Sequence, residues 1–341
     1  MMKVLTFGEM LMRLKTPNNQ RIMQAQAFET SYGGAEANVA VSLGLLGDQV
    51  AYLTRLPENL LGRNGQQTLR QYGVDTTKIQ FTDGRLGLYF FEKGASVRST
   101  NVVYDRAYSA FSLAKATEFD WASIFEGVDY FYFSGITPAV SAELAQAAEE
   151  ACQYCQAHQI PVICDLNYRG KMWSATQATQ TMRHLMTYVT ICIAHDEDFE
   201  ATLGIKAFDG DEAHGIAQKA SFKQAMQQVR QDFPNCQMVA SILRNIRSVE
   251  DSDWMALLLK GDQFYETDTY HVHVMEGVAA GDAFGAGLMH GLLNDYQPDE
   301  MLQFGLAASV AKLTISGDFN LVSEAEIKAI AANGGGARLA R

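Results

Sequence analysis

One acidic side chain, Asp282, lies among small residues in the segment Ala279-Ala280-Gly281-Asp282-Ala283-Phe284-Gly285-Ala286-Gly287, which leads into an apolar helical pattern. Free N–H groups at a helix start, together with the helix dipole, bind a phosphate or stabilise a developing anion. Small side chains allow such a backbone to approach a ligand closely. The segment is therefore either an anion-binding site or an ordinary helix start with Asp282 as its N-cap.

A second segment, Tyr32-Gly33-Gly34-Ala35-Glu36-Ala37-Asn38-Val39-Ala40, also opens a helical pattern. Its paired glycines would let a polyol approach the backbone, and the Asn38 amide could recognise hydroxyl groups. The alternative is a glycine-rich turn that brings a helix close to a sheet. The chain has neither a G-x-G-x-x-G fingerprint after its first strand nor a G-x-x-x-x-G-K-[ST] loop, which argues against a Rossmann dehydrogenase and a Walker-type site.

Polar side chains also follow a strand-like run in Cys164-Asp165-Leu166-Asn167-Tyr168-Arg169. Ligands of parallel α/β sheets bind at the carboxyl ends of the strands. Arg169 could bind a carboxylate or phosphate there through two parallel hydrogen bonds. Arg106, in Tyr104-Asp105-Arg106, supplies another cation at the end of a strand-like run. Either arginine alone is more commonly a surface residue.

The elements that must position these residues alternate between strand and helix. We expect strands over Val4–Phe7, Val50–Thr54, Val128–Phe133, Pro161–Cys164, Val189–Ile193 and Met238–Ile242. We expect helices over Ala35–Leu46, Leu60–Tyr72, Ala142–His158, Ala175–Met186, Asp196–Leu203, Glu212–Asp232, Asp282–Leu293 and Glu300–Ile315. Continuous apolar strands separated by helices predict an α/β fold with a mostly parallel sheet covered on both faces.

Two stretches interrupt this alternation, Met12–Tyr32 and Arg85–Ala110. The second contains two strand-like runs around a short turn, with no helix between them. Such segments predict a small antiparallel sheet that covers a ligand, or else a surface hairpin. We therefore divide the chain into a core and a lid. The core takes residues 1–12, 33–84 and 111–341, and the lid takes 13–32 and 85–110.

Composition narrows the class of ligand. The 341 residues include 27 Lys and Arg against 39 Asp and Glu, a formal net charge of −12. This balance argues against nucleic acid and anionic membranes as partners. No apolar window reaches the length of a membrane helix, and no signal-peptide pattern opens the chain. The pair Cys152 and Cys155 lies in a helical pattern without a second ligand pair, which argues against zinc. We expect a soluble, cytoplasmic protein.

Together, Gly33-Gly34-Ala35-Glu36-Ala37-Asn38 and Ala280-Gly281-Asp282-Ala283-Phe284 resemble the two signatures of the ribokinase-like (PfkB) sugar kinases. The resemblance extends over essentially the whole chain. Several middle segments are similar to 2-keto-3-deoxygluconate kinases of that family: Leu53-Thr54-Arg55-Leu56-Pro57, Tyr104-Asp105-Arg106, Phe133-Ser134-Gly135-Ile136-Thr137-Pro138 and Asp165-Leu166-Asn167-Tyr168-Arg169.

This resemblance implies a three-layer core with a β-sheet lid, phosphoryl transfer from ATP to a sugar acid, a Mg²⁺ cofactor and a homo-oligomer formed through the lid; it leaves a monovalent cation open. Asp282 would be the general base, and the N–H groups of Ala280, Gly281 and Asp282 would form the anion hole. The sugar-acid positions are Gly34, Asn38, Tyr89, Tyr104, Arg106 and Arg169. The nucleotide positions are Arg244, Ala279, Gly281, Ala308 and Asn320, and the metal position is Asp198.

Two departures from the family pattern bear on activity. Ala279 stands where the family usually has Gly, which costs about 1 kcal/mol if the position needs a positive φ. The family's metal-associated Asn-x-x-Glu reads His195-Asp196-Glu197-Asp198 here, so His195 is either a metal ligand or a tolerated replacement behind the metal. These changes keep two alternatives open: a sugar-binding pseudokinase, and a kinase of another sugar of the fructokinase or ribokinase type.

Overall fold

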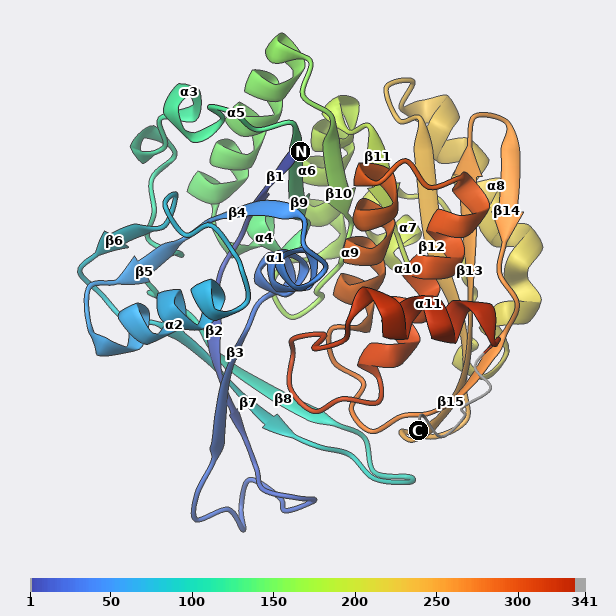
Figure 1. Ribbon diagram of the computed structural model, residues 1–341, viewed down its shortest axis with the longest axis horizontal. Helices are drawn as coiled ribbons and strands as arrows, with labels where there is room; N and C mark the ends of the chain where they lie inside the picture. Colours follow the sequence, from blue (N-terminus) through green and yellow to red (C-terminus); the bar gives the residue numbers. More distant parts are fainter. Residues whose placement is uncertain (1, 335–341) are drawn as a thin grey trace.

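The computed structural model describes residues 2–334, and its centre is a nine-stranded sheet with helices on both faces (Figure 1). Its path runs β14-β13-β12-β11-β10-β9-β1-β4, and β15 pairs with β13. The parallel strands are β1 (Lys3–Phe7), β4 (Gln49–Leu53), β9 (Tyr130–Ser134), β10 (Val162–Asp165), β11 (Ile191–Ile193) and β12 (Met238–Ile246). The predicted α/β class with a mostly parallel sheet is confirmed.

Neighbouring residues of one strand pack into different cores, because successive side chains of a strand point to opposite faces of the sheet. On β9, Tyr132 packs into one buried cluster, whereas Phe131 and Phe133 pack into the other. The first cluster is covered by α1 (Ala35–Leu45), α9 (Ala280–Leu293) and α10 (Pro298–Lys312). The second is covered by α3 (Trp121–Ile124), α5 (Ala142–His158), α6 (Ala175–Leu185), α7 (Asp198–Leu203) and α8 (Lys219–Asp232). These are the three layers of the core.

The far edge of the sheet was missing from the sequence prediction. It is an antiparallel unit of β13 (Asp251–Lys260), β14 (Gln263–Glu266) and β15 (Tyr270–His273), which extends the parallel strands beyond β12. These strands pair antiparallel with strands close to them in the sequence, and strand propensity depends strongly on packing context, which local periodicity reports poorly. The other unpredicted elements are β5 (Arg55–Pro57), β6 (Gln80–Thr82), α4 (Ile136–Val140) and α11 (Glu324–Ala332). The predicted helix 60–72 is α2 (Leu60–Gln71).

The lid is a separate four-stranded sheet that projects from the core (Figure 1). Its strands are β2 (Leu11–Lys15), β3 (Glu29–Gly33), β7 (Gly87–Glu92) and β8 (Asn101–Asp105), in the order β3-β2-β7-β8. The outer pairs are antiparallel, but β2 and β7 pair in parallel. The predicted small antiparallel lid sheet is confirmed, although β2 and β7 within it pair in parallel. Each central strand leaves the core in the same direction and then pairs with its own returning strand.

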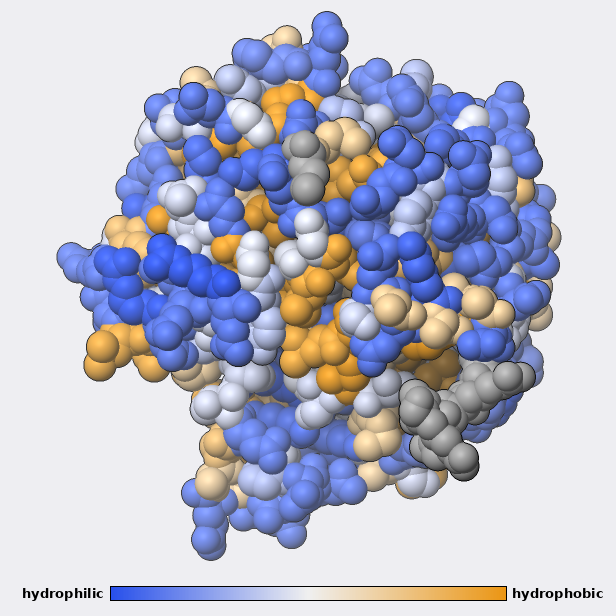
Figure 2. Space-filling model, viewed as in Figure 1, coloured by the Kyte–Doolittle hydropathy of each residue, from blue (hydrophilic) through white to orange (hydrophobic). Residues whose placement is uncertain are grey.

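The surface drawn in Figure 2 is largely hydrophilic, with apolar residues gathered across its middle. Among the described helices, none is both long and apolar enough to cross a membrane. Cys152 and Cys155 lie on α5 and are buried free thiols. The other three cysteines, Cys164, Cys192 and Cys236, are also free and buried.

Candidate active site

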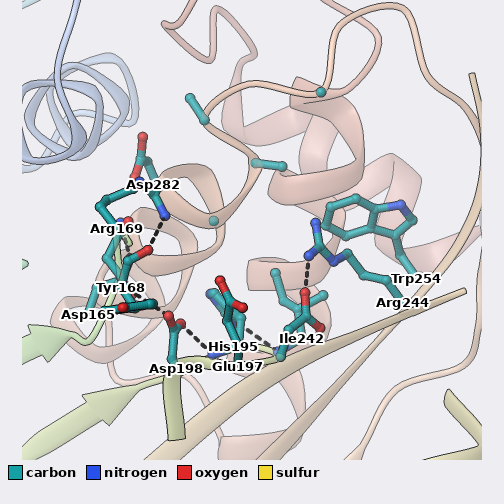
Figure 3. A pocket seen from close by; sticks show the side chains of 16 residues that line it. Asp165, Tyr168, Arg169, His195, Glu197, Asp198, Ile242, Arg244, Trp254 and Asp282 are labelled. Atoms are coloured by element: carbon teal, nitrogen blue, oxygen red, sulfur yellow. Dashed lines mark hydrogen bonds and ion pairs between the residues drawn. The ribbon is translucent and has the colours of Figure 1, made fainter. Parts of the chain in front are cut away.

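Two adjoining cavities lie at the carboxyl ends of the parallel strands. The larger cavity, about 230 Å³, lies over β10, β11 and β12, and the lid cavity, about 120 Å³, lies under the lid sheet. Arg169, Ala279 and Asp282 line both. Figure 3 shows the larger cavity with Arg169 and Asp282 on one side and Arg244 with Trp254 on the other. Two ligands bound in these cavities would therefore meet at Asp282.

Asp282 lies in the first turn of α9 and is buried. Burial raises its pKa to about 7, although a hydrogen bond from Asn38 and the charge of Arg169 lower it. Asn38 Nδ2 donates to Asp282 Oδ2 over 2.7 Å. A carboxylate whose pKa lies near neutrality is suited to accept a proton.

Ala279 is the N-cap residue of α9 and has φ 61° and ψ 16°, in the left-handed region. The position therefore needs the positive φ that a glycine adopts without strain. Ala280, Gly281 and Asp282 follow in the first turn, where backbone N–H groups have no partner inside the helix. Ala280, Gly281 and Asp282 line the larger cavity, and a helix start in such a position is suited to bind an anion.

The lid cavity contains the side chains predicted to bind the sugar. Gly34, Asn38, Tyr89 and Tyr104 all line it. A Cβ on Gly34 would lie 2.2 Å from the carbonyl oxygen of Glu9, so only glycine fits this approach of α1 to the chain after β1. The Tyr89 hydroxyl is already engaged, because it donates to Asp318 Oδ2 over 2.5 Å.

The two predicted arginines differ in their electrostatic state. Arg106 forms an ion pair with Glu9, with Nη2 2.5 Å and Nε 2.8 Å from Oε2. Arg169 is exposed and forms no ion pair with any acidic residue of the described chain; its Nη1 donates to the carbonyl oxygen of Tyr168. Of these two arginines, Arg169 is therefore the one whose guanidinium is free of an ion pair and can bind an anionic ligand directly.

Three buried carboxylates, on Asp165, Asp198 and Asp282, line the larger cavity. The two oxygens of Asp198 accept the backbone N–H groups of Tyr168 and His195, each over 2.8 Å. Burial raises the pKa of Asp198 to about 6, although these two hydrogen bonds lower it. Burial also raises the pKa of Asp165 well above its usual range, with Asp198 and Asp282 adding to the effect.

This donor set fits a magnesium ion only in part. Within residues 2–334, no three acidic, histidine or cysteine side chains come together as a complete metal site. Asp198 still holds carboxylate oxygens at the cavity wall, and Mg²⁺ commonly binds through one or two carboxylates with waters and substrate phosphates. The residues are therefore compatible with an ion that a nucleotide would bring.

The predicted nucleotide residues separate into two groups. Arg244, Ala279 and Gly281 line the larger cavity. Ala308 and Asn320 line neither cavity; both are buried, and Asn320 Nδ2 donates to the Ala308 carbonyl oxygen over 3.3 Å. The packing of α10 and the loop after it encloses both residues, and their role in nucleotide binding stays a prediction.

Sequence reasoning missed Trp254, whose ring lies 5.3 Å from the guanidinium carbon of Arg244 and lines the larger cavity. Arg244 also forms an ion pair with Asp196. Trp254 lies on β13, so its contribution depends on an antiparallel strand that the sequence analysis did not predict.

Two buried charged residues close to the site were also missed. Glu36 accepts hydrogen bonds from the Ser134 N–H and hydroxyl and from Thr137, which ties α1 to the end of β9. Arg13 of the lid is fully buried between Glu276 and Asp318, at 2.5 and 2.9 Å. Neither lies in a pattern that distinguishes it from a surface residue before the fold is known.

Comparison with known proteins shows the same architecture across the full chain. The profile described as "pfkB family carbohydrate kinase" matches residues 1–231 and 247–324. A 2-dehydro-3-deoxygalactonokinase of Haloferax volcanii is 32% identical over 332 residues, covering 97% of each chain. The crystal structure of 2-dehydro-3-deoxygluconokinase from Thermotoga maritima is 38% identical, with TM-score 0.92 over 98% of this chain and 100% of that one. A PfkB family carbohydrate kinase from Listeria grayi is 30% identical, with TM-score 0.89 over 97% and 100%.

Proposed function

The chain belongs to the PfkB family of carbohydrate kinases, and we propose that it transfers the γ-phosphoryl group of ATP to 2-keto-3-deoxygluconate (2-dehydro-3-deoxygluconate), giving the 6-phosphate. The observation that carries this proposal is the junction of the two cavities, where buried Asp282 and the unpaired Arg169 line both. The sugar acid would bind in the lid cavity and the nucleotide in the larger one.

In this mechanism Asp282 accepts the proton of the attacking sugar hydroxyl. The hydroxyl oxygen forms a bond to the γ-phosphorus while the bond from that phosphorus to the bridging oxygen breaks, and ADP leaves. The N–H groups of Ala280, Gly281 and Asp282 stabilise the charge on the transferring group, where positioning and electrostatics account for most of the catalysis. A bound Mg²⁺ would neutralise phosphate charge, with Asp198 as the nearest candidate carboxylate from this chain.

The charge at the junction favours an acidic substrate over a neutral sugar. Arg169 reaches the lid cavity without a carboxylate partner from the described chain, so a substrate carboxylate would give it one. Arg106 is neutralised by Glu9 and can add hydrogen bonds to the ligand but little net charge. A neutral ketose would leave the exposed Arg169 guanidinium in water, without the charge-assisted hydrogen bond that a substrate carboxylate would form.

A second candidate substrate is 2-keto-3-deoxygalactonate, because the Haloferax volcanii relative is named for it. A coupled assay of ADP release with ATP and Mg²⁺ should compare both sugar acids with fructose and ribose. We expect the highest kcat/KM for 2-keto-3-deoxygluconate and low values for the neutral sugars. A higher value for the galactonate would select the second candidate. Absence of ADP release with every sugar would instead support a pseudokinase.

A further inference from the structure

His195 occupies a position that the proposed mechanism has not used. It follows β11 directly, and its ring lies at the wall of the larger cavity between β11 and β12 (Figure 3). Its backbone N–H donates to Asp198, and its ring packs edge-on against Phe284 of α9, with ring centroids 6.0 Å apart. The side chain is therefore held in one orientation by both neighbouring strands and by α9.

The hydrogen bond at one ring nitrogen determines which nitrogen carries the proton. The backbone N–H of Ile242 on β12 lies 3.1 Å from His195 Nδ1. A backbone N–H can only donate, so Nδ1 must be the acceptor and the proton of the neutral ring must lie on Nε2. A metal ligand at Nε2 would need the opposite tautomer and would lose the bond from Ile242.

The resulting Nε2–H points toward the anion-binding helix start and lacks a partner. Nε2 is a buried atom, and no residue between 2 and 334 accepts a hydrogen bond from it. A Cβ built on Gly281 would lie 3.5 Å from it, so the glycine leaves the space before this donor open. A buried donor without a partner is costly unless a ligand supplies one.

We propose that His195 donates its Nε2–H to a phosphate oxygen of the bound nucleotide and so holds the phosphate chain against the start of α9. This assigns the histidine a role as a fixed, uncharged donor, in place of a metal ligand or a passive replacement. The inference rests on the proposed kinase function, because it requires a phosphorylated ligand in the larger cavity.

The wild-type protein tests the assignment directly. In protein labelled with ¹⁵N-histidine, His195→Gln identifies the His195 signals among the seven histidines of the chain. We expect the Nε2–H tautomer without ligand, and a shift of this proton resonance when β,γ-imido-ATP with Mg²⁺ is added. Adenosine, which lacks phosphates, should leave the resonance in place. A proton on Nδ1, or equal responses to adenosine and the ATP analogue, would overturn the proposal.

Kinetics of variants supply the second test. His195→Phe keeps the ring and removes the donor, so kcat/KM for ATP should fall by about 10- to 100-fold while the KM for sugar changes less than about twofold. His195→Gln places an amide donor near the same point and should recover at least about fivefold over Phe. The matched control is His214→Gln, because His214 is an exposed histidine that does not line the larger cavity. Equal activity of the Phe and Gln variants would contradict the donor role.

The two proposals fail in different ways. A nucleotide-dependent shift of the His195 proton without phosphorylation of any sugar acid would disprove the proposed substrate and leave the assignment of His195 standing. Phosphorylation of the sugar acid with an unresponsive His195 proton would disprove the assignment alone.

Discussion

Asn38 on α1 donates from Nδ2 to Asp282 Oδ2 on α9 over 2.7 Å, which joins the starts of two helices that lie 244 residues apart in the sequence. The bond favours the ionised carboxylate, whereas burial disfavours it and dominates, so that the pKa lies at about 7. The contact between the two signature segments thus partly offsets the effect of burial on the pKa of the expected general base.

Removing the Asn38 amide should shift the pH dependence of the reaction. In Asn38→Leu the carboxylate loses a hydrogen bond to its charged form, so the pKa of Asp282 should rise further and the acidic limb of kcat/KM should move to higher pH. A pH profile measures this shift. Ser42→Ala, one turn further along α1, is the control, since Ser42 donates to the Asn38 carbonyl oxygen and does not contact Asp282. An unmoved limb would show that another group titrates.

Asp282→Asn should separate activity from stability. The loss of a general base should reduce kcat by about 10²- to 10⁴-fold, with sugar binding nearly unchanged. Because folding raises the pKa from 3.8 to about 7, the folded protein binds more protons than the unfolded one between these values, and stability falls as pH rises through this window. The variant lacks this penalty, so its Tm relative to wild type should be higher at pH 8 than at pH 4. A kcat within about threefold of wild type would show that Asp282 is not the general base and only places a negative charge in the first turn of α9.

Ala279→Gly should relieve backbone strain at the start of α9. A non-glycine residue at φ 61° costs about 1 kcal/mol, so glycine should stabilise the fold by up to this amount. We also expect kcat to rise with little change in the KM for sugar, because the anion hole acts on the transition state. Ala283→Gly, inside the same helix, should destabilise instead. A lower kcat for the Ala279 variant would mean that alanine holds the competent geometry.

Arg169→Leu should abolish the preference for sugar acids. Because the variant loses a charge-assisted hydrogen bond to the substrate carboxylate, kcat/KM for the acid should fall by about 10- to 100-fold, with little loss for fructose. Lys should restore only part of the activity, because it lacks the planar guanidinium. If Arg169 contacted nucleotide phosphates instead, all sugars would lose activity equally and the KM for ATP would rise.

Arg13→Met tests the buried connection between lid and core. The substitution leaves buried Asp318 without its ion pair and Glu276 with Lys15 alone, and breaking a buried pair typically costs about 3–5 kcal/mol. Urea unfolding measures this loss. Arg63→Met breaks an exposed pair with Glu58 and should cost about 0–1 kcal/mol. Similar losses in both variants would contradict a special role for the buried cluster.

Local patterns predicted the parallel strands and most of the longer helices, including the two helix starts that contain the signature segments. The helix Ala142–His158 has the predicted bounds, because its pattern begins at a capping Ser141 whose side chain accepts the Leu144 N–H. The small residues before Asp282 likewise predicted a helix start at the cavity, since a ligand must approach its backbone. The sequence showed that Ala279 departs from the family pattern, and the structure showed that this residue has a positive φ.

Long-range packing decided the rest. Nothing local distinguishes Arg106, neutralised by Glu9, from Arg169, which has no such partner, because a net charge at a site depends on residues brought together from distant segments. Long-range packing also buries Ala308 and Asn320, and it places Trp254 of β13 at the wall of the larger cavity. The tautomer of His195 is determined by a backbone N–H on the adjacent strand β12, and strand order is a property of the tertiary fold.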